Sequence, residues 1–306
     1  MPFVYRIVIA AVGLAATLQG TSASGAVAAP QDERPNIVFI YLDDLGWSDV
    51  GFHGSTFYET PHLDRLAARG MRFSNAYANA PKCAPSRASL LSGMYAPRHG
   101  VFTVGDPWRG PREARRLIPA ENNTTLAPDV FTLAEALKEA GYATAHVGKW
   151  HLGESGVAGP EEQGFDVNIG GTHAGHPPTY FSPYRIATLE DGPPGEYLTD
   201  RLTDETLGFI EVHQDRPFFL YLSHYAVHTP IEGQAEIAER YADKPTWHGQ
   251  ANAEYAAMIE SVDRGVGRIV EKLDALGLTD ETVIVFSSDN GGLGGYASAG
   301  LEHSRN

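Results

Sequence analysis

Four apolar runs, each followed by polar or ionisable residues, constrain the fold of this 306-residue chain most strongly. Three read as strands buried on both faces and one is shorter; they span 36–42, 143–147, 217–223 and 282–288. Helix-like segments alternate with them, at 61–69, 133–140, 200–213 and 253–276. This alternation predicts an α/β fold with a mostly parallel sheet sandwiched by helices.

The residues that follow these runs are typical of a ligand site. In chain order they are Asp43 and Asp44, Lys149 and His151, His224 and His228, and Asp289 and Asn290. Ligands of such sheets bind at the carboxyl ends of the strands. We therefore expect these side chains to converge at one edge. The Gly- and Pro-rich segment 153–194 predicts a long loop with little regular structure.

The N-terminus predicts export. Arg6 precedes an apolar run at 7–18 and small residues that end in Ala26-Val27-Ala28, the pattern of a secretory signal peptide. The apolar run is shorter than the roughly 20 residues of a membrane span. We expect a signal peptide at 1–28, a short linker at 29–35 and a catalytic domain at 36–306. The mature protein would be secreted or periplasmic, without a membrane span.

The charge balance excludes one class of partner. The formal net charge is −15, whereas nucleic-acid binding requires a basic surface. The overall field would also repel an anionic substrate, so that any anion site must be built from local cations.

Cys83 is the single cysteine and cannot form an internal disulfide. It lies in the run KCAPSR at 82–87, and residues 84–91 favour a helix with Pro85 in its first turn. Cys83 would then lie at a helix N-terminus, where backbone N–H groups favour anions. Arg87, four residues later, can reach back over that turn. The alternatives to a chemical role are an inert buried thiol and a disulfide bond to another chain.

Together these motifs resemble the sulfatases of the alkaline-phosphatase-like superfamily. The matching pieces occur in family order at 43–44, 83–87, 141–142, 148–151, 227–230 and 288–291. The resemblance implies a sulfuric ester hydrolase acting on an aryl or carbohydrate sulfate ester. The C-x-P-S-R pattern implies that a maturase oxidises Cys83 to formylglycine (3-oxoalanine).

The acidic residues offer only oxygen ligands, which select calcium or magnesium over zinc. The resemblance implies that the ion is calcium. Its ligands would be Asp43, Asp44, Asp289, Asn290 and Cys83, the last in its formylglycine form.

The remaining roles also follow from the resemblance. The hydrate of residue 83 is the nucleophile: one geminal hydroxyl attacks sulfur, and the other expels sulfate as the aldehyde re-forms. Lys149 binds the sulfate and the hydrate, His151 handles a proton of the diol, and His228 is the general acid. His224 and the loop histidines His173 and His176 are expected to be structural, although the loop could contact substrate.

The C-terminus departs from the family pattern. Members continue into a lysine that assists the leaving group and into a small C-terminal subdomain, whereas the last lysine here is Lys272. We therefore expect a catalytic domain that is incomplete at its C-terminal end, without that subdomain and with an exposed sheet edge. Two alternatives stay open: a phosphonate or phosphate monoester hydrolase of the same superfamily, and an inactive domain that only binds calcium and sulfated glycan.

Overall fold

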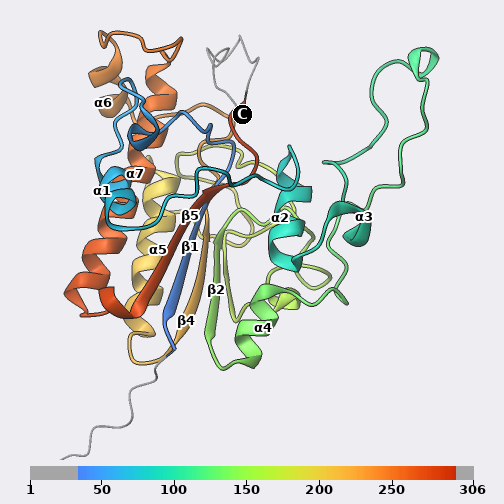
Figure 1. The fold of residues 1–306 in the computed structure, drawn as a ribbon, viewed down its shortest axis with the longest axis horizontal. Helices are drawn as coiled ribbons and strands as arrows, with labels where there is room; N and C mark the ends of the chain where they lie inside the picture. The colour runs from blue at the N-terminus through green and yellow to red at the C-terminus, as the bar shows by residue number, and fades with distance from the viewer. Residues whose placement is uncertain (1–33, 294–306) are drawn as a thin grey trace, which may run out of the picture. The chain divides into compact units, whose positions relative to one another are not determined.

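The computed structural model describes residues 34–293, which contain a five-stranded parallel sheet of order β3-β2-β4-β1-β5 (Figure 1). The strands are β1 (Asn36–Leu42), β2 (Ala143–Gly148), β3 (Val167–Ile169), β4 (Phe218–Ser223) and β5 (Thr282–Ser288). The expected signal peptide, nearly all of the linker and the end of the catalytic domain lie outside the described residues. No helix within 34–293 is long and apolar enough to cross a membrane.

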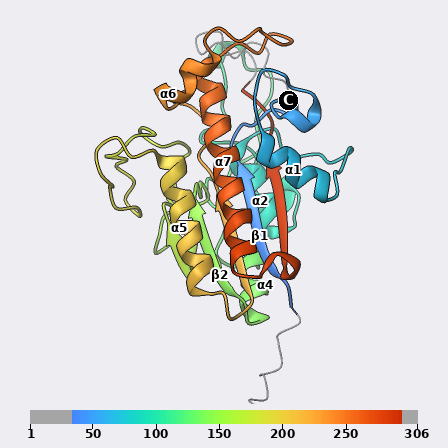
Figure 2. The same cartoon turned by 90° about the vertical axis from the view of Figure 1, so that its left-hand side faces the viewer.

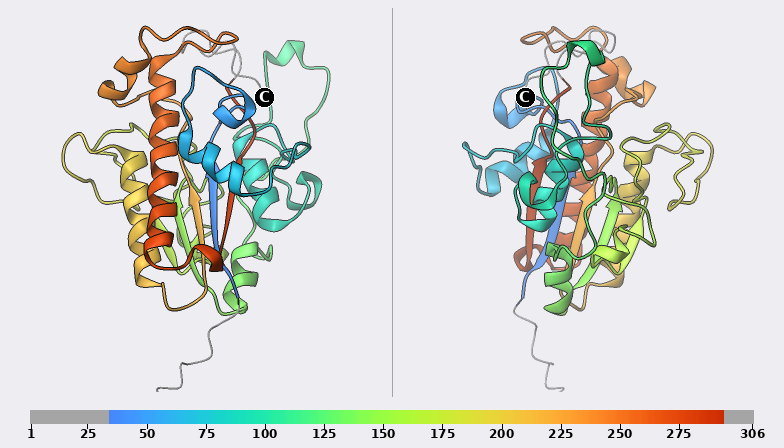
Figure 3. Two further views of the ribbon diagram at one scale, coloured as in Figure 1. Left: turned by 60° about the vertical axis from the view of Figure 1, so that its left-hand side comes forward. Right: turned by 90° about the vertical axis from the view of Figure 1, so that its right-hand side faces the viewer.

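Helices cover both faces of the sheet, which confirms the predicted fold class. The α-helices are α1 (Pro61–Arg69), α2 (Cys83–Ser92), α3 (Ala96–His99), α4 (Leu133–Glu139), α5 (Leu198–Val212), α6 (Ala235–Ala238) and α7 (Ala253–Ala275). Short 3-10 turns span Gly51–His53, Arg112–Ala114, Glu161–Gln163, Glu239–Tyr241 and Thr279–Glu281. Figure 2 shows α5 and α7 side by side across one face with α1 next to α7. The right-hand view of Figure 3 shows α2 and α4 on the other face.

The core explains why the strand segments are continuously apolar. In β1, Val38, Ile40 and Leu42 are buried in the cluster that includes the apolar faces of α5 and α7. The alternate residue Tyr41 is buried on the opposite face, in the cluster that includes α2 and α4. Because successive strand residues point to opposite faces, both sets of side chains are removed from water.

One strand lies where the sequence predicts a loop. β3 falls within segment 153–194 and is only three residues long, with half-buried side chains. It pairs with β2, and Asn168 lies 3.3 Å from the ring of His146 (Oδ1 to Nδ1). A strand this short and only half-buried carries no apolar run, so that the glycines and prolines around it dominate the pattern.

The register between β1 and β5 places the two acidic motifs side by side. Leu42 pairs with Ser288 at the end of the parallel ladder, so that the residues after both strands emerge next to each other. Among the described residues β5 has no neighbour on its outer side, and Val283 is 48% exposed there.

Candidate active site

Backbone hydrogen bonds extend the strand ladders into the site. The N–H of Lys149 donates to Ser223 O (2.7 Å), and the N–H of Asp289 donates to Leu42 O (3.0 Å). The strand ends β1, β2, β4 and β5 therefore hold their following residues at one edge of the sheet, as the rule for parallel sheets predicts.

Gly148 allows the tight junction after β2. Its φ is +107°, and a Cβ at this position would lie 2.0 Å from Ser223 O. Only glycine has both this backbone freedom and the absent side chain, so that Lys149 can turn directly from the strand end into the site.

An acidic cluster lies at the centre. The carboxylates of Asp43, Asp44 and Asp289 have oxygens within 4.8 Å of one another, and all three side chains are buried. The Asp44 N–H donates to Asp289 Oδ1 (3.2 Å), and Asn290 Nδ2 donates to Asp44 Oδ1 (2.6 Å). Burial raises the pKa of both Asp44 and Asp289, and neighbouring carboxylate charge adds to the rise.

The cluster suits a hard cation. Among the described residues, Asp43 Oδ1, Asp44 Oδ2 and Asn290 Oδ1 are buried without a hydrogen-bond partner. Unsatisfied buried oxygens are costly, and carboxylates this close repel each other. A divalent cation with oxygen ligands would relieve both penalties. The residues therefore form a possible metal site.

Two buried cations face these carboxylates. Lys149 Nζ pairs with Asp43, and Arg87 donates from Nε (3.1 Å) and Nη2 (2.9 Å) to Asp289 Oδ2. Burial alone would lower the pKa of both side chains. The nearby carboxylates have the larger effect and raise it: Asp289 chiefly raises the pKa of Arg87, and Asp43 chiefly raises that of Lys149. Both side chains therefore stay protonated.

Arg87 contacts several groups beyond its own helix. Its guanidinium binds the carboxylate of Asp289, while Nη1 donates to Lys149 O (3.0 Å) and to the Ser223 hydroxyl. The guanidinium also interacts electrostatically with Cys83, at the start of α2.

Cys83 is the first residue of α2 and is half-buried. Its sulfur, an oxygen of Asp43 and a ring nitrogen of His228 lie within 4.8 Å of one another. Burial, reinforced by the charge of Asp43, raises the pKa of the Cys83 thiol well above its usual range. The thiol is therefore neutral near pH 7.

His151 lies next to Lys149 but not in the extended conformation that the sequence suggests. Its φ is +65°, and its N–H donates to Thr172 O (2.9 Å). Its Nδ1 is buried without a hydrogen-bond partner among the described residues. Burial lowers the pKa of His151 to about 2, with the charges of Lys149 and Arg87 adding to the effect. The ring is therefore neutral.

His228 lies next to the acidic cluster, beside Asp44. Its Nε2 is 3.5 Å from Asp44 Oδ2, and its Nδ1 is 2.9 Å from Thr229 O. The structure thus brings together every residue expected at the site, from Asp43 to Asn290. His224 is buried at the end of β4, and burial lowers its pKa to about 4.

Two loop histidines that the sequence assigns a structural role also reach the site. The His173 ring lies 6.3 Å from that of His151, and the His176 ring lies 6.1 Å from that of His228. Their spacing in Gly-Thr-His-Ala-Gly-His, directly beyond a strand of the sheet, is the signal that could have marked them. Loop conformation carries no periodic pattern, so that the sequence alone does not place them.

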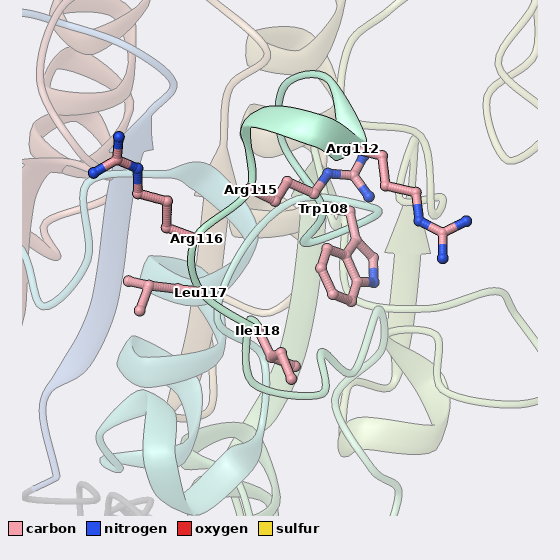
Figure 4. A pocket seen from close by; sticks show the side chains of 6 residues that line it. All are labelled: Trp108, Arg112, Arg115, Arg116, Leu117 and Ile118. Carbon is pink, nitrogen blue, oxygen red and sulfur yellow. The ribbon is translucent and has the colours of Figure 1, made fainter.

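An arginine-rich hollow of about 480 Å³ lies outside this cluster (Figure 4). Its lining residues are Trp108, Arg112, Arg115, Arg116, Leu117 and Ile118. The Arg115 guanidinium lies 5.0 Å from the Trp108 ring centroid. None of these lining residues belongs to the acidic cluster.

Known proteins resemble this chain in sequence and in fold. The N-acetylgalactosamine-6-sulfatase of Canis lupus familiaris is 35% identical, over 88% of this chain and 52% of its own length. The crystal structure of Ps i-CgsB in complex with k-i-k-neocarrahexaose is 33% identical, with a TM-score of 0.72 over 88% of this chain and 61% of that one. The phosphonate monoester hydrolase of Agrobacterium radiobacter, 21% identical with a TM-score of 0.62 over 84% of this chain and 62% of that one, shares the fold.

The chain thus spans about half the length of the curated relative it matches. The model of the family named Sulfatase matches residues 35–305, which include all the strand-end motifs. This chain belongs to the sulfatase family.

Proposed function

We propose that this chain carries the catalytic residues of a sulfuric ester hydrolase that removes sulfate from a carbohydrate or aryl sulfate ester. The observation that carries the proposal is the position of Cys83, within 4.8 Å of an Asp43 carboxylate oxygen and a His228 ring nitrogen at a helix N-terminus. The similarity to an N-acetylgalactosamine-6-sulfatase and to the complex of Ps i-CgsB with k-i-k-neocarrahexaose favours a sulfated glycan as the substrate.

The environment of Cys83 supports an oxidised nucleophile. Residues 83–87 match the C-x-P-S-R pattern. A thiolate that attacked sulfur would be left as a stable S-sulfated cysteine, whereas a formylglycine hydrate expels sulfate as the aldehyde re-forms. We infer that the active form carries formylglycine at residue 83, produced by a maturase.

The reaction then has two covalent steps. One geminal hydroxyl oxygen attacks sulfur, its proton passes to Asp43, and the bond from sulfur to the leaving oxygen breaks as that oxygen takes a proton from His228 Nε2. The second geminal hydroxyl then gives its proton to the neutral ring of His151, whose pKa the bound sulfate raises by offsetting the charges of Lys149 and Arg87. The carbon–oxygen bond to sulfate breaks, the aldehyde re-forms, and water restores the hydrate.

The cations and the metal ligands have separate tasks. Lys149, protonated beside Asp43, attracts the sulfate despite the net charge of −15. Asp43, Asp44, Asp289 and Asn290 would hold a calcium ion, which supplies Lewis-acid stabilisation of the sulfate oxygens when bound. Arg87 holds the Asp289 carboxylate through two hydrogen bonds to Oδ2.

Mass spectrometry of the peptide that contains residue 83 tests the proposal most directly. We expect the sulfur to be lost and an aldehyde to be present when the protein is produced in a cell that has the maturase. Rates on 4-nitrophenyl sulfate and 4-nitrophenyl phosphate, measured in parallel, should favour the sulfate. An intact thiol in a protein that hydrolyses sulfate esters would contradict the assignment of the nucleophile.

Calcium should stabilise the folded protein. A ligand at a hundredfold excess over its Kd adds about 2.7 kcal/mol to the free energy of unfolding, so that adding calcium to chelator-treated protein should raise the melting temperature. The Asp44→Asn variant should lose most of this response. The matched control is Asp215→Asn, which changes an exposed aspartate outside the cluster and should respond like the wild type. An unchanged wild-type melting temperature in excess calcium would rule out the site.

We also propose that the protein is exported to the periplasm or the extracellular space, as the N-terminal segment 1–28 suggests. N-terminal sequencing of the protein recovered outside the cytoplasm should begin after Ala28.

A further inference from the structure

We propose that His176 is a positioning residue: its ring stacks on His228 and holds it in the orientation in which Nε2 faces the reaction centre. This inference rests on the proposed function, because it concerns the group that protonates the leaving oxygen.

The two rings are nearly parallel. Their centroids are 6.1 Å apart and their planes differ by 7°, within the range of stacked aromatic pairs. His176 is exposed, whereas the His228 side chain is only 18% exposed. The more exposed of the two parallel rings is therefore that of His176.

Each ring also forms a hydrogen bond with the backbone carbonyl of the next residue. His228 Nδ1 lies 2.9 Å from Thr229 O, and His176 Nδ1 lies 3.2 Å from Pro177 O. A carbonyl oxygen only accepts, so that each Nδ1 carries a hydrogen. In the imidazolium form of His228, the form that can donate a proton to the leaving oxygen, Nε2 carries the second hydrogen and faces the site.

The loop that carries His176 is fixed against the site. Thr172 O accepts the N–H of His151 (2.9 Å), and the Gly171 N–H donates to Asn168 Oδ1 (3.0 Å). A Cβ on Gly175 would lie 2.6 Å from the His151 ring, so that the backbone before His176 runs directly against that ring. The position of His176 is therefore built into the fold.

On the other side, the backbone of His228 is also restrained. The Tyr180 hydroxyl donates to His228 O (2.9 Å). With its backbone and Nδ1 held, the remaining freedom of His228 is a tilt of the ring, which the parallel ring of His176 limits. Tilting moves Nε2 away from the leaving oxygen, and this matters most when that oxygen is too basic to leave unprotonated.

The test compares two leaving groups in His176→Ala and His176→Phe. For N-acetylgalactosamine 6-sulfate, His176→Ala should lower kcat about 2- to 12-fold, the rate equivalent of the ~0.5–1.5 kcal/mol of an aromatic pair, with KM unchanged. For 4-nitrophenyl sulfate, whose phenolate leaves easily, kcat should stay at the wild-type value. His176→Phe keeps a flat ring and should restore the rate on the sugar sulfate.

His213→Ala is the matched control, because His213 also stacks on an aromatic ring, that of Phe209 (4.1 Å), but lies at the end of α5. Both of its rates should equal those of the wild type. Equal losses on both substrates in His176→Ala, a change in KM alone, or no rescue by phenylalanine would overturn the inference.

A second measurement does not depend on turnover. The ¹⁵N imidazole resonances of His228, assigned with His228→Gln, should show one tautomer in the wild type and exchange broadening in His176→Ala. Identical spectra in the two proteins would overturn the inference. Failure of the wild type to hydrolyse any sulfate ester would instead count against the proposed function, and the resonances would still decide the role of His176.

Discussion

Replacing Cys83 by alanine should abolish the hydrolysis of sulfate esters while leaving the fold intact. Loss of a nucleophile costs on the order of 10³–10⁶-fold in rate, so that kcat/KM for 4-nitrophenyl sulfate should fall to background. The side chain is small and half-buried, and we expect the free energy of unfolding to change by less than about 1 kcal/mol.

Two further variants sharpen this result. Cys83→Ser should remain inactive unless a maturase that accepts serine is present. Ser92→Ala removes a hydroxyl from the far end of the same helix, where it donates to Ala88 O, and should keep the wild-type activity. Substantial turnover by the alanine variant would remove residue 83 from the mechanism.

Replacing Arg87 by alanine should destabilise the metal-free protein strongly. Arg87 and Asp289 are both buried, and the pair is held by two hydrogen bonds. Removing one partner of a buried pair leaves an uncompensated charge and typically costs about 3–5 kcal/mol. Urea unfolding in the presence of chelator should show this loss. Because a bound cation would compensate the Asp289 charge, the loss should be smaller in saturating calcium.

Two controls separate this effect from ordinary loss of contacts. The double variant Arg87→Met with Asp289→Asn should be more stable than the sum of the single variants implies, since neither charge is left alone. Arg268→Ala breaks an exposed pair with Asp204 and should cost at most about 1 kcal/mol. A loss for Arg87→Ala that is the same with calcium and with chelator would contradict a cation beside Asp289.

The helices and strands could be predicted where the sequence has a long apolar or amphipathic pattern. The bounds of β1, β5 and α1 match the sequence prediction, because each carries an apolar or amphipathic pattern over at least seven residues. The expectation that residues 282–288 are buried on both faces is wrong, because β5 is the edge strand of the described sheet and its side chains are only partly buried. The helix expected at 200–213 instead spans Leu198–Val212, a shift typical of helix ends, where the burial pattern fades. β3 was not predictable, since three half-buried residues do not differ from a loop.

Part of the candidate site could likewise be predicted from the sequence, and part could not. That Asp43, Lys149 and Asp289 meet follows from one rule about the ends of parallel strands. Which cation binds which carboxylate does not follow, because Arg87 and Asp289 are separated by 202 positions and meet only where α2 packs against the sheet. His176 depends on a loop conformation that only the folded chain defines.

The place of β1 in the sheet has a consequence for synthesis. β1 lies between β4 and β5, yet both neighbours are translated at least 176 residues after its last residue, Leu42. At ~5–20 residues per second, β1 would wait roughly 9–35 s for its first partner. During that time a seven-residue apolar segment with no charge is exposed, which is a sequence type prone to aggregation. Productive folding in the cell should therefore depend on chaperones that shield this segment until the ribosome has delivered β4.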